Sequence, residues 1–308
     1  MHITIRVPAT SANLGPGFDS LGLALDLWND TAMMLAIEYT VQVTGEGRER
    51  LSPGENNMII RSAQRLAEQV GKRLPPFHVD SVNRIPLSSG LGSSAAAKLT
   101  GLLGANVLLG KPLSREEILE LATDMEGHPD NVAPALFGGL VVSTVENGKV
   151  LTHKINVDGS HSPLGSFESP IQVTVVLPDM HFSTRESRAA LPENVPITNA
   201  VHNISRAVLV AEAFRNGDLA LLSRAMTDTL HQPYRFKLIP GAQAALNAAK
   251  EAGAAAVALS GAGPSLIAFS ANGQPAIGEA MQRAFKEAGL ESRIFPLKMS
   301  NHGAEVHI

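Results

Sequence analysis

The sequence predicts an α+β protein of two domains. Segments with the two-residue alternation of β-strands and segments with the spacing of amphipathic helices occur in both halves of the chain. The 308 residues are enough for about two domains of roughly 150 residues each. Between 156 and 170 the periodicity is lost and Ser, Gly, Pro and His accumulate, which is typical of a linker. We therefore predict an N-terminal domain over 1–165 and a C-terminal domain over 166–308.

The first elements are predicted to be strands of one sheet. Residues 2–7 alternate and are rich in β-branched side chains, and Pro8 is expected to end this strand and to open a loop over 9–19. Three further β-prone runs follow, at 21–28, 31–37 and 40–44.

Helices and strands then alternate up to residue 155. Apolar residues at helical spacing predict helices over 59–70 and 93–109, with a strand at 77–82 between them. Ser114 followed by Glu117 forms a capping-box pattern, which predicts a helix that continues to 125. A charged turn is expected over 126–131. The pair Asn147-Gly148 predicts the tight turn of a hairpin over 139–155.

The second half repeats this mixture of elements. Strands are predicted at 171–177, 256–260, 266–269 and 293–297, and helices at 200–214, 219–230, 241–252 and 276–288.

The composition excludes several classes of function. With 25 basic and 29 acidic residues the net charge is −4, and no basic run is present, so neither nucleic acid nor an anionic membrane is an expected partner. The absence of cysteine excludes disulfides, thiolate metal sites and cysteine nucleophiles. The N-terminus lacks the pattern of a secretion signal, and the uncharged stretch 252–278 is too rich in Gly and Pro for a membrane helix. We expect a cytoplasmic protein with small-molecule ligands.

The segment 86–96, P-L-S-S-G-L-G-S-S-A-A, lies between a predicted strand and a predicted helix. Gly90 and Gly92 allow close approach of the backbone to a ligand, and Ser93 and Ser94 stand where the helix begins. The unpaired N–H groups of a first helical turn, together with the helix dipole, bind phosphate. The segment therefore predicts a phosphate-binding loop. The alternative is a tight strand-to-helix turn with packed alanines.

Two other phosphate-binding patterns fit less well. The Walker-type loop needs a Lys directly after its last Gly, and Lys98 is not at that position. Gly90, Gly92 and Ala95 match the dinucleotide pattern G-x-G-x-x-A, but the region about twenty residues later is a helix start and not a strand end. A nicotinamide-dependent enzyme is the distant alternative.

Segment 86–96 resembles the nucleotide-binding motif of the GHMP kinases. Residues 8–19, P-A-T-S-A-N-L-G-P-G-F-D, are similar to the family's N-terminal motif, and residues 259–265, L-S-G-A-G-P-S, to its C-terminal glycine loop. The three motifs stand in the family's order and span most of the chain. Together with residues 126–134, E-G-H-P-D-N-V-A-P, the first motif is most similar to the homoserine kinase branch.

The resemblance implies a GHMP kinase-like two-domain fold, with a ribosomal-protein-S5-like N-terminal domain, a ferredoxin-like C-terminal domain and the active site between them. It also implies ATP- and Mg²⁺-dependent phosphorylation of the side-chain hydroxyl of L-homoserine to O-phospho-L-homoserine, a step toward threonine. Dimerisation is common in the family, so a homodimer is one expectation. The alternatives are a kinase for mevalonate or a related alcohol, and a nucleotide-binding regulator without turnover. Asp19 favours an amino acid substrate because it would bind an ammonium group.

The resemblance further implies roles for individual residues. ATP would be bound by Asn57 and Met58 and by the loop residues Pro86, Leu87, Ser88, Ser89, Gly90, Leu91, Gly92, Ser93, Ser94, Ala95 and Ala96. On the residues alone, a helix cap is the favoured role of Asn57. Mg²⁺ would be held by Ser94 and Glu126, with Glu120 as the fallback ligand. The substrate would be bound by Asn13, Asp19, His128, Asn131, Thr184, Arg188, Arg235 and Gly263.

Arg188, Asp130 and Asn131 are the expected catalytic positions. In relatives such as mevalonate kinase an Asp is thought to take the hydroxyl proton, and Asp130 is its nearest equivalent, whereas homoserine kinases are thought to turn Asn131 toward the substrate. Phosphoryl transfer through a loose transition state needs mainly alignment and charge neutralisation. Our hypothesis is that Asp130 supports the site structurally and that Arg188 stabilises the phosphoryl group in transfer.

Overall fold

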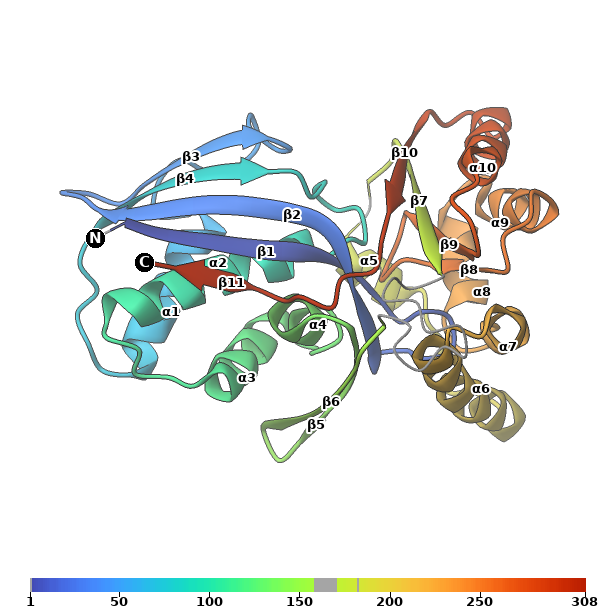
Figure 1. Ribbon diagram of the computed structural model, residues 1–308, viewed down its shortest axis with the longest axis horizontal. Helices are drawn as coiled ribbons and strands as arrows, with labels where there is room; N and C mark the ends of the chain where they lie inside the picture. The colour runs from blue at the N-terminus through green and yellow to red at the C-terminus, as the bar shows by residue number, and fades with distance from the viewer. Residues whose placement is uncertain (1, 158–170, 182) are drawn as a thin grey trace.

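The computed structural model describes residues 2–157, 171–181 and 183–308. It contains two β-sheets with helices packed on them, as predicted for an α+β chain (Figure 1). The predicted domain boundary at residue 165 lies outside the described residues. No helix in the described ranges is long and apolar enough to cross a membrane.

The first sheet has seven strands among the described residues, in the order β11-β1-β2-β4-β3, with β5 paired to β2 and β6 paired to β5. Its strands are β1 (His2–Ala12), β2 (Leu21–Leu35), β3 (Thr40–Gly45), β4 (Phe77–Asn83), β5 (Leu140–Glu146), β6 (Lys149–Ile155) and β11 (Glu305–His307). The helices on it are α1 (Met58–Gln69), α2 (Ser93–Leu108), α3 (Arg115–Glu126) and α4 (Val132–Phe137). These helices lie along one face of the sheet, and β11 brings the C-terminus back beside β1 (Figure 1).

The prediction that Pro8 ends the first strand was wrong. β1 continues to Ala12 and pairs with β2 along its length, from His2 opposite Met34 to Ala12 opposite Gly22. The register shifts between Pro8 and Ala9, so the proline lies at an irregularity of the ladder, where its missing N–H is tolerated. The longer strand places the following loop, residues 13–20, at the far end of the sheet.

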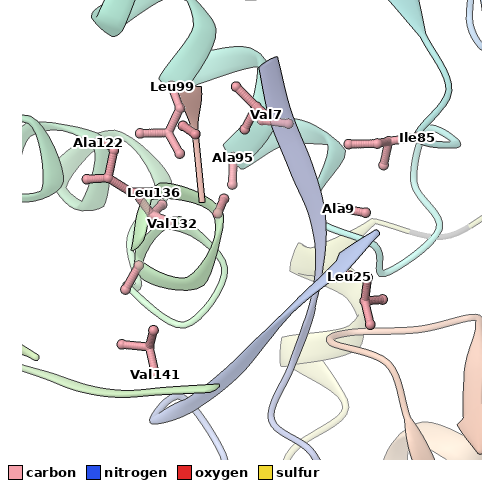
Figure 2. Close-up of a cluster of buried hydrophobic side chains, with 14 of the residues drawn as sticks. Val7, Ala9, Leu25, Ile85, Ala95, Leu99, Ala122, Val132, Leu136 and Val141 are labelled. Carbon is pink, nitrogen blue, oxygen red and sulfur yellow. The ribbon is translucent and has the colours of Figure 1, made fainter. Parts of the chain in front are cut away.

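The core of this part lies between the sheet and its helices. Figure 2 shows Val7 and Ala9 of β1 beside Ala95 and Leu99 of α2, with Val132 of α4 nearby; all five are fully buried. Full burial of a leucine such as Leu99, or of a valine, contributes about 1.5–3 kcal/mol per side chain to the stability of the fold. Because α2 is enclosed by α1, α3 and β1, its N-terminus is held in a fixed position.

The second sheet has four antiparallel strands in the order β10-β7-β9-β8 within the described residues. They are β7 (Gln172–Pro178), β8 (Ala256–Leu259), β9 (Leu266–Ser270) and β10 (Ser292–Leu297). The helices of this half are α5 (Thr184–Ala189), α6 (Ile197–Asn216), α7 (Leu219–Ala225), α8 (Gln232–Arg235), α9 (Ala242–Glu251) and α10 (Pro275–Glu287), and a single 3₁₀ turn, Phe236–Leu238, follows α8. Helices α9 and α10 pack on the sheet through residues such as Ala249, Met281 and Phe285.

Three short helices, α4, α5 and α8, were not predicted, and α7 ends five residues earlier than predicted. After α7 ends at Ala225, the Asp228 carboxylate accepts the backbone N–H groups of residues 230, 231 and 232 and so stabilises the turn that leads into α8. The hairpin was correct: Asn147 and Gly148 both have positive φ, 51° and 76°, between β5 and β6.

Candidate active site

Three segments that are distant in the sequence are joined by hydrogen bonds at one cleft. The backbone N–H of Gly261, in the loop between β8 and β9, donates to the carbonyl of Ala12 at 3.0 Å. The Ser260 hydroxyl donates to the carbonyl of Gly90 at 2.8 Å. The cleft is lined by Asn13, Asp19, Ser88, Ser89, Gly90, Gly92, Ser93, Ser94, Glu126, His128, Asp130, Asn131, Ser183, Thr184, Arg188, Arg235, Gly261, Ala262 and Gly263. All eight predicted substrate-binding residues are on this wall.

The predicted phosphate loop forms one side of the cleft. Gly92 has a left-handed conformation with φ of 72° and precedes the first turn of α2, where Ser93 and Ser94 face the cleft. The first-turn N–H groups of this buried helix carry its positive dipole end. Not all of segment 86–96 lines the cleft, because the side chains of Leu91, Ala95 and Ala96 are fully buried in the core and Pro86 lines a different hollow.

A more apolar hollow adjoins the cleft and shares Ser88, Ser93 and Ser94 with it. Leu87 and Met58 contribute to its wall, together with Asn29, Thr31, Val43, Arg50, Leu51, Asn57, Ile59, Ser81, Asn83, Ala97 and Thr100. The Asn57 side chain caps α1, since its Oδ1 accepts from the N–H of residue 59 at 3.0 Å. Its Nδ2 donates to a backbone carbonyl at 2.7 Å, so both polar groups of Asn57 are already bound within the protein.

Glu126 and Ser94 bring two oxygen donors together at the phosphate loop. The Ser94 hydroxyl donates to Oε2 of Glu126 at 3.0 Å, and Lys98 forms an ion pair with the same carboxylate oxygen. A hydroxyl and one carboxylate suit Mg²⁺ when phosphate oxygens and water complete its shell. In the part of the chain that the structure describes, no group of three or more His, Asp or Glu residues could hold a metal alone. Glu120, the fallback ligand, does not line the cleft.

The turn between α3 and α4 contributes His128, Asp130 and Asn131. Nδ1 of His128 donates to Oδ1 of Asp130 at 2.5 Å, and Nδ2 of Asn131 donates to the same oxygen at 3.4 Å. Burial lowers the pKa of His128, but the hydrogen bond and the charge of Asp130 outweigh it, so that the pKa lies above its usual value. The Asp130 side chain is 1% exposed and is held on one oxygen by both neighbours. This geometry favours a positioning role for Asp130.

Asp19 and Arg188 face each other across the cleft mouth as a two-point ion pair, with both N–O distances at 2.9 Å. Arg188 is on α5, whose N-cap residue Ser183 forms a capping box with Glu186. The hydrogen bond to Asp19 raises the pKa of Arg188 above its usual value. Both side chains are more than one-third exposed, so the pair contributes at most about 1 kcal/mol to stability.

Arg235 lies deeper than Arg188 and is almost completely buried, with 2% of its surface exposed. Its Nη1 donates to the carbonyl of Gly261 at 3.2 Å, and its Nε has no hydrogen-bond partner within the protein. Burial, together with the charge of Arg188, lowers the pKa of Arg235 to about 10, so the side chain stays charged at neutral pH. Phe18 lies under both guanidinium groups, 5.1 Å from Arg235 and 5.6 Å from Arg188. Because this buried cation lines the cleft, it favours an anionic group on the ligand.

A buried histidine holds Arg235 in place. Nε2 of His231 donates to the carbonyl of Gly15 at 2.7 Å, so its Nδ1 is the acceptor for Nη1 of Arg235 at 3.3 Å. Burial lowers the pKa of His231, and the charge of Arg235 lowers it further, against the opposing charge of Asp228. The neutral ring is therefore part of the folded site.

We expect acid to destabilise the protein through His231. Because its folded-state pKa is depressed, the unfolded chain takes up the proton first, and stability falls as the pH drops below the unfolded value of about 6.5, by at most ~1.4 kcal/mol per pH unit. Denaturant unfolding between pH 5 and 8 measures this slope. His231→Gln keeps an N–H donor but does not titrate, so its free energy of unfolding should change less with pH over this range. Parallel curves for the two proteins would rule out His231 as the source.

Several residues of the site were missed by the sequence analysis. Ser183 had a readable signal, the Ser-x-x-Glu capping pattern with Glu186. Phe18 is inside the recognised first motif, but the sequence does not show that its ring lies under two arginines. Lys98, Asp228 and His231 gave no signal, because burial of a polar side chain follows from tertiary contacts and not from periodicity.

Comparison with known proteins gives concordant matches. The profile of the GHMP kinases N terminal domain matches residues 57–139, and that of the GHMP kinases C terminal domain matches residues 210–287. The chain is 44% identical over 303 residues to a homoserine kinase of Moorella thermoacetica, covering 98% of this chain and 99% of the relative. It is similar to the crystal structure of homoserine kinase from Cytophaga hutchinsonii, with a TM-score of 0.84, 30% identity and coverage of 99% and 97%. A mevalonate kinase of Methanococcus jannaschii shares the fold alone, at a TM-score of 0.67 and 15% identity over 97% and 98% of the chains.

Proposed function

Because the chain belongs to the GHMP kinase family, in line with the resemblance drawn from its sequence motifs, we propose that it transfers the γ-phosphoryl group of ATP to the side-chain hydroxyl of L-homoserine. The observation that carries the proposal is the charge pattern of the cleft. Two arginines, Arg188 and Arg235, and the carboxylate of Asp19 line the same cleft as the phosphate loop. This pattern matches a zwitterionic amino acid that carries a hydroxyl group.

Binding of the amino acid replaces the ion pair between Arg188 and Asp19 with ion pairs to the substrate. We expect its carboxylate to bind the guanidinium groups of Arg235 and Arg188, and its ammonium group to bind Asp19, which is paired with Arg188 in this structure. One internal ion pair is thereby replaced by contacts to both charges of the substrate. Asn13 shapes the pocket from behind, because its amide is already bonded to the carbonyl of Gly261 and to the N–H of Asp19.

ATP is proposed to place its phosphates on segment 88–94 and its base in the adjoining hollow at Met58. Ser94 and Glu126 would hold Mg²⁺, which neutralises phosphate charge when bound. Arg188, at the cleft mouth, stabilises the phosphoryl group in transfer. Asp130 keeps His128 and Asn131 in position and is not needed as a base.

The test is ADP formation with Mg·ATP and a panel of acceptors: L-homoserine, mevalonate, galactose, L-serine and none. We expect turnover with L-homoserine alone. Turnover with mevalonate in place of homoserine would overturn the substrate assignment, since mevalonate has no ammonium group for Asp19. If every acceptor failed while ATP still raised the melting temperature, a nucleotide-binding regulator would replace the kinase.

We keep a homodimer and a cytoplasmic location as predictions. Sedimentation of the purified protein tests the first, and cell fractionation tests the second.

A further inference from the structure

Lys98 is a cation that the proposed reaction does not use. It stands in the second turn of α2, four residues after Ser94, so both side chains lie on the same face of the helix. Only 8% of Lys98 is exposed. Its ammonium group forms an ion pair with Glu126, whose side chain is 14% exposed, at the last residue of α3.

Lys98 approaches Glu126 from outside the cleft. Glu126 lines the cleft, whereas Lys98 lines a separate surface hollow together with Met58, Arg61, Ser62, Gln64, Arg65, Glu68 and Met125. The ammonium group and the Ser94 hydroxyl both contact Oε2 of Glu126. Lys98 therefore contacts the carboxylate from a position that does not line the cleft where the phosphates are proposed to lie.

The ion pair with Lys98 reduces the negative charge that Glu126 presents to a metal ion. Glu126 and Lys98 together are neutral, and the third group, Ser94, is a neutral hydroxyl. Mg²⁺ gives up its hydration shell reluctantly and binds where carboxylates and phosphates supply negative charge. A neutral site holds free metal poorly, but it accepts the metal when the nucleotide brings its phosphates.

We propose that Lys98 is a positioning residue that neutralises Glu126 from behind and so makes metal binding at Glu126 depend on bound nucleotide. The inference rests on the proposed function for the identity of the metal site. It does not depend on which acceptor is phosphorylated.

The experiment measures Mn²⁺ binding by electron paramagnetic resonance in the full-length protein, with and without ADP, for the wild type and Lys98→Met. Removal of a group that supports a metal ligand typically costs 10–100-fold in metal affinity. Lys98 instead competes with the metal for Glu126, so we expect a change of this order with the opposite sign. We expect Lys98→Met to bind Mn²⁺ about tenfold more tightly with ADP, and to bind it measurably without ADP, where the wild type does not. The apparent KM for Mg²⁺ in turnover should fall by a similar factor, with a smaller change in kcat.

The same substitution should have the opposite effect on stability without metal. In EDTA, Lys98→Met should melt at a lower temperature than the wild type, because Glu126 is left mostly buried without its partner. In a Glu126→Gln background both effects of Lys98→Met should disappear. Lys98→Arg keeps the charge and should restore the wild-type Mn²⁺ affinity.

Weaker Mn²⁺ binding in Lys98→Met would overturn the inference, because it would mean that Lys98 supports the metal site. Weaker binding of ADP in EDTA would also overturn it, because it would place Lys98 on the phosphates. If Lys98→Met does not fold, Lys98→Gln, which also removes the charge, is measured in the same way. If the acceptor panel gave no turnover but Mn²⁺ binding behaved as stated, the proposed function would fail and the inference on Lys98 would stand.

Discussion

Arg188→Ala is expected to lower kcat by about 10³ or more. An arginine that stabilises charge on a phosphoryl group in transfer contributes 10³–10⁵ in kcat. The protein should stay folded, because the Arg188–Asp19 ion pair is partly exposed and contributes little to stability. Single-turnover measurements with saturating L-homoserine and Mg·ATP give the effect on the chemical step.

Two results would contradict this role. If KM for homoserine rose while kcat stayed the same, Arg188 would only bind the substrate carboxylate. If kcat fell by less than about tenfold, some other group would be stabilising the transition state.

Asp130→Asn is the matched control for Arg188→Ala. The substitution keeps the shape of a side chain that is 1% exposed and keeps an oxygen that can accept from His128. If Asp130 acts by position alone, the variant retains kcat within about tenfold, whereas loss of a general base costs 10²–10⁴. A large loss in Asp130→Asn together with a small loss in Arg188→Ala would reverse the assigned roles.

The sequence predicted those parts of the site that depend on local backbone geometry. The small residues of segment 86–96 indicated a tight loop before a helix, and the structure has this loop, with positive φ at Gly90 and Gly92 and α2 starting at Ser93. The expected GHMP kinase fold is confirmed by the family profiles and by the match to a solved homoserine kinase. Short motifs predict such loops because a few adjacent residues determine the local backbone conformation.

The parts that were missed depend on contacts between distant segments. The network from Asp228 through His231 to Arg235 joins α8 to the carbonyls of Gly15 and Gly261, which come from opposite ends of the chain. Nothing in the spacing of those residues shows that they are buried. The same holds for Lys98, which looks like a surface residue of an Ala-rich helix until α3 brings Glu126 beside it. The roles of the individual cleft residues stay predictions.

Gly90→Ala is expected to cost about 3 kcal/mol of stability and to weaken ADP binding. Its φ of 79° is left-handed, which costs an alanine about 1–2 kcal/mol, and overpacking adds about 1–3 kcal/mol. A Cβ at this position would lie 2.1 Å from the carbonyl oxygen of Ser260 and 3.0 Å from that of Gly263. The phosphate loop and the C-terminal glycine loop would then have to separate, which breaks the 2.8 Å hydrogen bond from the Ser260 hydroxyl to Gly90.

Gly110→Ala is the control that separates the cost of the left-handed backbone in Gly90→Ala from the cost of the steric clash. Gly110 follows the other end of α2 with a similar φ of 85°, but a Cβ there would meet nothing within 4 Å. It should therefore lose only about 1–2 kcal/mol, the cost of the left-handed conformation, and should bind ADP like the wild type. Denaturant unfolding and calorimetric titration with ADP compare the two variants. Equal losses in both would mean that the contact between the two loops does not hold the phosphate site. A larger loss of both stability and ADP affinity in Gly90→Ala would show that both depend on the contact between the two backbone loops. The C-terminal glycine loop would then hold the proposed phosphate loop in the shape that binds the nucleotide.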